Sequence, residues 1–182
     1  MTFTETKLAG CFIIEPAVFG DDRGYFLESF NYQKFSEAIG YDVRFIQDNQ
    51  SYSSYGVLRG LHLQKGEDAQ AKLVRVLSGK VLDVVVDVRS ESKTYGQYIA
   101  VELSSDNKKQ LFVPRGFAHG FVVLSETAEF FYKVDNYYAP QSESGLLYND
   151  PELGIDWGVE ESELSLAPKD LLQPLLKDFT DK

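Results

Sequence analysis

The sequence has 182 residues, of which 43% are hydrophobic and 25% charged, with a formal net charge of −10 at pH 7. One domain over residues 1–182 is expected, because a chain of this length buries roughly 70% of its unfolded surface. The negative charge argues against a nucleic-acid partner, and no apolar run approaches the ~20 residues that span a bilayer, so no membrane partner is expected either.

The N-terminal stretch "MTFTETKLAGCFIIEP" contains a short apolar patch that is broken by Glu15 and Pro16. This pattern is typical of a first strand rather than a signal peptide, so a cytoplasmic protein is expected. Cys11 is the only cysteine, which excludes an internal disulfide and a zinc site built from several thiolates. We expect it to be a core residue.

Short strand-like runs dominate the rest of the chain. "KLVRVLSGKVLDVVVDV", residues 72–88, predicts two strands that form a hairpin around Ser78-Gly79, because apolar and polar residues alternate with a period of two. Similar runs cover residues 96–104, 109–116, 119–125 and 129–138, and turn residues separate them. Many short strands of this kind indicate an all-β sandwich or barrel.

Two segments predict peripheral helices. Residues 31–40 can begin at an Asn31 cap and end at Gly40, whereas residues 166–179 predict a short helix that Pro174 interrupts. With no linker in the sequence, we expect the tail from about residue 158 to 182 to pack back on the same domain.

The stretch "GVLRGLHLQ" holds His62, one of only two histidines. A metal site needs about three or four converging ligands, and only His119 could join His62, which argues against a metal. A packed core histidine is the simplest alternative. However, Arg59, Lys72 and Arg75 lie in the same region, and a pocket for a phosphorylated ligand would explain this basic cluster.

Several motifs in chain order resemble one family. They are "DDRGYFLESF", "QDNQS", "GVLRGLHLQ", "AKLVRVLSGKVLDVVVDVR", "PRGFAHGFVVLSETAEFFYKVDNYYAP" and "YNDPELGIDW". Together they closely resemble the dTDP-4-dehydrorhamnose 3,5-epimerase family of deoxysugar biosynthesis. The resemblance implies a cupin-like jelly roll that acts as a homodimer without metal or other cofactor, with N-terminal strands exchanged between the subunits.

The resemblance also implies roles for individual residues. His62 would be the base, with Asp170 as its carboxylate partner, Tyr132 the opposing acid, and Lys72 a neighbour of the ketone oxygen. The residues expected to line the nucleotide-sugar site are Arg23, Glu28, Gln47, Asn49, Arg59, His119, Glu143 and Lys169, with Phe26 and Tyr138 flanking the thymine. Strict alternation places Arg59 opposite His62, so we expect a bulge or bend at Gly60.

The implied reaction is inversion of C3 and C5 of dTDP-4-dehydro-6-deoxy-D-glucose, which gives dTDP-4-dehydro-L-rhamnose. A 4-keto group acidifies both neighbouring carbons, so an imidazole base and a tyrosine acid on opposite faces suit the chemistry. Two alternatives remain open at the level of sequence. They are an epimerase for C3 or C5 alone, and a noncatalytic jelly roll that binds sugar nucleotides.

Overall fold

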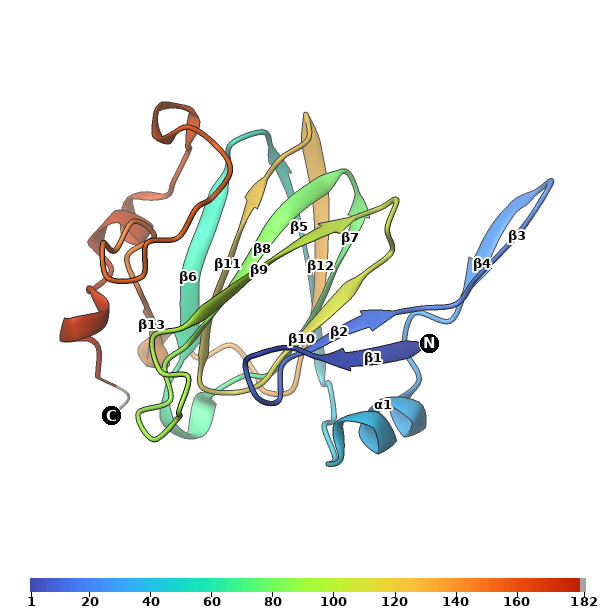
Figure 1. Cartoon of the computed structure of the whole chain (residues 1–182), viewed down its shortest axis with the longest axis horizontal. Coiled ribbons are helices and arrows are strands. Elements are labelled where there is room, and N and C mark those ends of the chain that lie inside the picture. The colour runs from blue at the N-terminus through green and yellow to red at the C-terminus, as the bar shows by residue number, and fades with distance from the viewer. Residues whose placement is uncertain (181–182) are drawn as a thin grey trace.

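Two facing β-sheets form a sandwich in the computed structural model (Figure 1). The structure describes residues 1–180, so Asp181 and Lys182 of the expected C-terminal tail lie outside the described residues. One sheet has the strand order β1-β2-β10-β7-β12-β5, and the other has the order β13-β6-β11-β8-β9. The all-β jelly-roll class expected from the sequence is confirmed.

The six-stranded sheet consists of β1 (Thr2–Glu5), β2 (Phe12–Glu15), β5 (Gln47–Ser54), β7 (Lys72–Ser78), β10 (Gln110–Val113) and β12 (Thr127–Val134). The five-stranded sheet consists of β6 (Leu58–Gln64), β8 (Lys80–Asp87), β9 (Tyr98–Ser104), β11 (Phe117–Val123) and β13 (Glu143–Gly145). A separate two-stranded ribbon consists of β3 (Val18–Asp21) and β4 (Gly24–Leu27). The helical elements are α1 (Tyr32–Ile39) and the short 3-10 helices η1 (Gly66–Asp68), η2 (Pro140–Ser142), η3 (Glu161–Glu163), η4 (Pro168–Leu172) and η5 (Leu176–Asp178).

Helix α1 begins and ends where its capping residues predict. The Asn31 side chain accepts a hydrogen bond from the backbone N–H of Lys34, and Gly40 closes the helix in the left-handed conformation with φ = 84°. Phe35 and Ile39 bury the inner face of the helix against the sheet residues. The expected C-terminal helix is instead two 3-10 turns, η4 and η5, one on each side of Pro174.

The predicted hairpin over residues 72–88 is wrong. Both strands exist, but β7 pairs with β10 and β12, while β8 pairs with β11 and β9 in the facing sheet. Between them Gly79 has φ = 79°, and a Cβ atom there would lie 2.0 Å from the Thr127 carbonyl oxygen. Alternation identifies a strand but not its neighbour, and here the glycine turn carries the chain from one sheet to the other.

The core between the sheets is apolar and close-packed. Cys11 is fully buried in it, as expected, and burial raises the pKa of its thiol to about 12. Phe121 of β11 and Phe130 of β12 stack across the space between the sheets, with ring centroids 4.1 Å apart. These two rings therefore join the two layers directly.

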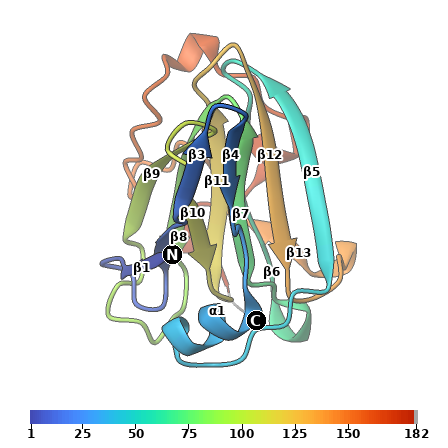
Figure 2. The same cartoon turned by 90° about the vertical axis from the view of Figure 1, so that its right-hand side faces the viewer.

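The β3–β4 ribbon extends away from the sandwich (Figure 1), and in the view of Figure 2 it lies in front of the two sheets. It carries three large aromatic side chains, Phe19, Tyr25 and Phe26, which are 66%, 61% and 70% exposed. At its tip Arg23 pairs with Asp21. Such a concentration of exposed aromatic surface on a ribbon with no third strand is a typical feature of an interaction surface.

The segment from Gly158 to Thr180 runs along the outside of the five-stranded sheet, beside β6 (Figure 1). Its apolar side chains, Leu164, Leu166 and Leu176, pack with Leu61 and Trp157 in one cluster. Among residues 1–180, no helix is long and apolar enough to cross a membrane.

Candidate active site

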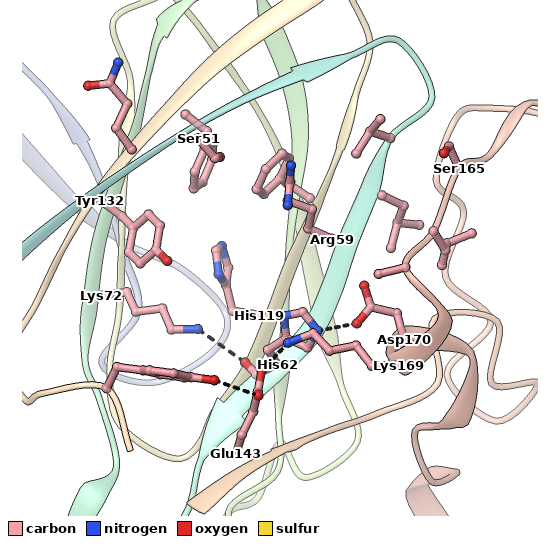
Figure 3. Close-up of a pocket in the computed structure, with 18 residues that line it drawn as sticks. Ser51, Arg59, His62, Lys72, His119, Tyr132, Glu143, Ser165, Lys169 and Asp170 are labelled. Atoms are coloured by element: carbon pink, nitrogen blue, oxygen red, sulfur yellow. Dashed lines mark hydrogen bonds and ion pairs between the residues drawn. The ribbon is translucent and has the colours of Figure 1, made fainter. Parts of the chain in front are cut away.

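A cavity of about 610 Å³ opens between the two sheets. Strands β5, β7 and β12 contribute to its lining from one sheet, β6, β11 and β13 from the other, and the segment from Ser165 to Asp170 closes one side (Figure 3). The basic, acidic and aromatic groups expected at one site therefore come from both layers of the sandwich.

His62 and Asp170 form a close pair at the side of this cavity. His62 Nε2 lies 2.6 Å from Asp170 Oδ1, and the Asp170 side chain is almost fully buried. Burial lowers the pKa of His62, although the hydrogen bond to Asp170 acts in the opposite direction. Because a carboxylate only accepts, Nε2 carries the proton and Nδ1 of the neutral ring keeps its lone pair. The pair is suited to accept a proton near neutral pH.

A bulge in β6 brings Arg59 and His62 to the same cavity. His62 pairs with His119 and Arg59 with Phe121, so three steps on β6 face two steps on β11. Gly60 has φ = 137°, and a Cβ atom there would lie 2.5 Å from Gly120 Cα, so only glycine fits this close approach. The bend expected at Gly60 is confirmed.

Lys72 reaches into the cavity from β7, on the sheet opposite His62. Its ammonium donates to the His62 carbonyl oxygen at 3.3 Å (Figure 3). Burial lowers its pKa to about 8, although the negative charges of Asp83 and Glu143 act in the opposite direction. A poorly solvated ammonium group is well suited to stabilise a negative charge that develops on a bound ligand.

Tyr132 lines the cavity from β12, so it belongs to the sheet that faces His62 (Figure 3). Burial raises the pKa of its phenol, and the positive charge of Arg59 opposes this only in part. The phenol is therefore protonated at neutral pH and can donate a proton. A group that can accept a proton and a group that can donate one thus lie on facing walls of the cavity.

His119 is part of a second histidine–carboxylate pair. Its Nε2 lies 3.0 Å from both carboxylate oxygens of Asp83, which is completely buried on β8. Burial raises the pKa of Asp83, whereas the charges of His119 and Lys72 lower it. Asp83 therefore fixes the orientation of the His119 ring at the cavity wall.

Glu143, Lys169 and Tyr138 meet at the cavity edge. Lys169 Nζ lies 2.6 Å from Glu143 Oε1, and the Tyr138 hydroxyl donates to Glu143 Oε2 at 3.1 Å (Figure 3). Burial opposes ionisation of Glu143, but Lys169 and Tyr138 outweigh it, so the pKa of Glu143 is lowered. With Arg59 and Lys72, Lys169 gives this acidic protein a local basic cluster.

A profile of the family described as dTDP-4-dehydrorhamnose 3,5-epimerase matches residues 5–178. The chain belongs to this epimerase family. The family member from Salmonella typhimurium is 54% identical over 176 residues, which cover 97% of this chain and 96% of that protein.

Solved structures of epimerases superpose closely on this chain. The dTDP-4-dehydrorhamnose 3,5-epimerase from Elizabethkingia anophelis has a TM-score of 0.96 and 55% identity, covering 100% of this chain and 99% of its own. An epimerase from Legionella pneumophila, solved in complex with dTDP-4-keto-L-rhamnose, has a TM-score of 0.94 and 48% identity, covering 98% of this chain and 94% of its own. These epimerase relatives share the fold over nearly the whole chain.

Five residues expected at the epimerase site do not line this cavity within the described chain. Arg23 and Phe26 lie on the extended ribbon, and Glu28 pairs with Lys34 at 2.8 Å beside α1. Gln47 and Asn49 lie on β5 and are hydrogen-bonded to each other at 2.9 Å. The remaining nine expected residues do line it, namely Arg59, His62, Lys72, His119, Tyr132, Tyr138, Glu143, Lys169 and Asp170.

Asp83 is the polar group that our sequence analysis missed. It stands in the apolar run "VLDVVVDV", where a carboxylate at a core-facing position is unusual and could have been noticed. Within the described residues, no group of three or more His, Cys, Asp or Glu side chains is arranged to hold a metal ion.

Proposed function

We propose that this chain inverts C3 and C5 of dTDP-4-dehydro-6-deoxy-D-glucose and produces dTDP-4-dehydro-L-rhamnose. The observation that carries the proposal is the placement of His62 and Tyr132 on facing sheets of one cavity, with the Lys72 ammonium also inside it. Inversion requires proton removal from one face of the sugar and proton return to the other, and this arrangement supplies both groups.

The proposed steps are the same at each carbon. Neutral His62 removes the proton next to the 4-ketone, and Asp170 stabilises the imidazolium that forms. The electron pair moves to the ketone oxygen, where Lys72 stabilises the enolate. The pair then returns to carbon, which takes a proton from Tyr132 on the opposite face. No redox step occurs, so the reaction needs no redox cofactor.

Proton NMR of the substrate in deuterium oxide tests this function. Purified protein should replace the hydrogens at both C3 and C5 with deuterium and produce the rhamno-configured ketone. Exchange at one carbon only would identify an enzyme for that carbon alone. Unchanged substrate after prolonged incubation with folded protein would favour a noncatalytic binding module.

We expect Arg59 to bind the diphosphate of the nucleotide. Its Nε donates to Ser53 Oγ at 3.1 Å, which orients the guanidinium at the cavity wall. Arg59→Ala should weaken dTDP binding by about 1.5–3 kcal/mol, as for the loss of charged hydrogen bonds. Calorimetry measures this loss, and Arg44→Ala on the exposed surface is the matched control. Equal dTDP affinity in both variants would show that Arg59 has only a structural role.

The low pKa of Lys72 predicts an alkaline limit to catalysis. Its ammonium is present below about pH 8 and is lost above it, so kcat/KM of the free enzyme should fall as pH rises through this value. Tyr132 does not produce this limb, because its pKa is raised above 10.0. A pH–rate profile checks the expectation, with Lys72→Met as the variant whose residual activity should lack the limb. A flat wild-type profile to about pH 10 would contradict the role of Lys72.

We also propose that the chain works as a cytoplasmic homodimer in which each single-domain subunit lends its β3–β4 ribbon to its partner. The exposed Phe19, Tyr25 and Phe26 support the proposal, because a protruding ribbon of this composition gains stability when a second chain covers it. In such a dimer Arg23, Phe26 and Glu28 would reach the partner's cavity, which is consistent with their absence from the lining of their own.

Sedimentation velocity and variant mixing test the dimer. Arg23→Ala and His62→Ala should each be inactive as homodimers. Coexpressed in equal amounts, they should recover about a quarter of wild-type activity, because half of the dimers are hybrids and each hybrid has one intact site of two. A fully active monomer, or no recovery from a proven hybrid, would refute the shared site.

A further inference from the structure

Asp170 is not part of the sandwich that holds the rest of the site. It lies on η4, within a segment that we call the C-terminal strap, residues 165–179, which runs outside β6 (Figures 1 and 3). The carboxylate must nevertheless stay 2.6 Å from His62 Nε2. The geometry of the base therefore depends on how the strap is attached to the sheets.

The strap is attached on both sides of Asp170. Before it, the Ser165 N–H donates to the Gly56 carbonyl, and the Leu58 N–H donates to the Ser165 carbonyl, both at 2.9 Å. After it, the Leu147 N–H donates to the Pro174 carbonyl at 2.9 Å, and the Leu176 side chain is buried. The second attachment lies on the loop that follows β13.

A single carboxylate completes this second attachment. Asp150, which is 2% exposed, accepts the Leu176 N–H through Oδ2 at 2.6 Å and the Glu152 N–H through Oδ1 at 2.8 Å. Both carboxylate oxygens are needed for this attachment, because each accepts a hydrogen bond from a different backbone N–H group. Asp150 does not line the cavity, so it has no direct access to a bound sugar.

We propose that Asp150 is a positioning residue for catalysis, because it fastens the C-terminal strap and thereby holds Asp170 against His62. The inference rests on the proposed function of His62 as the base. A small shift of the strap would cost catalysis much more than binding, because proton transfer depends on the alignment of the His62–Asp170 pair.

Asp150→Asn tests the proposal with nearly constant volume. An amide has one oxygen, so one of the two backbone N–H groups would face an NH₂ donor and the strap attachment would loosen. We expect kcat to fall roughly 10- to 100-fold while dTDP affinity changes much less. Asp156→Asn is the matched control, since Asp156 Oδ1 accepts the Gly158 N–H at 2.9 Å in an exposed turn and an asparagine oxygen can accept the same bond.

A double-variant cycle separates positioning from general loss of stability. In an Asp170→Ala background, Asp150→Asn should reduce kcat little further, because the contact with His62 that it maintains is already gone. Full additivity of the two losses, or wild-type kcat in folded Asp150→Asn, would overturn the proposal. Leu176→Ala weakens the same attachment by removing the buried side chain on the strap. It replaces Asp150→Asn in the test if that variant does not fold.

Histidine NMR gives a readout that does not depend on turnover. The chain has two histidines, so the ring signals of His62 and His119 can be assigned with one variant each. Asp150→Asn should shift the His62 signals toward those of Asp170→Ala and leave His119 unchanged. Unmoved His62 signals would reject the positioning role, whereas absent wild-type turnover with the expected shifts would reject only the proposed function.

Discussion

His62→Ala is expected to abolish both incorporation of solvent deuterium into the sugar and formation of product. The Nδ1 lone pair of this imidazole is free to accept a carbon-bound proton, because Nε2 is committed to Asp170. Without it no proton leaves, so neither half of the reaction begins. NMR of the substrate in deuterium oxide measures both processes at once.

The control for this variant is binding. His62→Ala should remain folded and should still bind dTDP, because Arg59 and Lys169 remain in the cavity. Near-normal deuterium exchange in that folded protein would mean that the imidazole only binds or packs. The base would then have to be another group of the cavity, either His119 or a carboxylate.

Tyr132→Phe is expected to separate exchange from inversion. The variant keeps the aromatic volume and the whole His62–Asp170 pair, so proton removal and return on the His62 face can continue. Inverted product should fall by roughly 10²–10⁴-fold, the usual effect of losing a general acid. Deuterium at the reacting carbons without inversion would be the characteristic result.

Tyr41→Phe is a suitable comparison, because Tyr41 is half-exposed and lies outside the cavity. It should retain wild-type exchange and inversion. Wild-type inversion by Tyr132→Phe would show that another group, or water, protonates the enolate. Tyr132 would then be a packing residue, as most aromatics at such positions are.

Local signals in the sequence predict much of the fold. The caps of α1, Asn31 and Gly40, act within one helical turn, and the apolar residues of β7 and β8 are mostly buried. Strand pairing depends on partners far along the chain, which alternation does not encode. For that reason both strands around Gly79 were predictable and their pairing was not.

The site was predictable mainly where motifs carry it. His62, Lys72 and Tyr132 stand in the motifs that resemble the family, and the structure brings them to one cavity. The contact between His62 and Asp170 spans 108 positions, so no spacing rule predicts it. Asp83 was missed because one carboxylate in an apolar strand does not reveal its partner. The catalytic roles themselves remain predictions.

The stacked rings of Phe121 and Phe130 hold the two sheets apart beside the cavity. Each ring belongs to a different sheet, and both line the cavity beside the reacting groups. Active-site residues are often carried by loops, whereas here the proposed base and acid, His62 and Tyr132, lie on strands. The width available to a sugar ring is therefore set by aromatic volume in the core. A change in the length of the connecting loops would leave this contact between the two sheets in place.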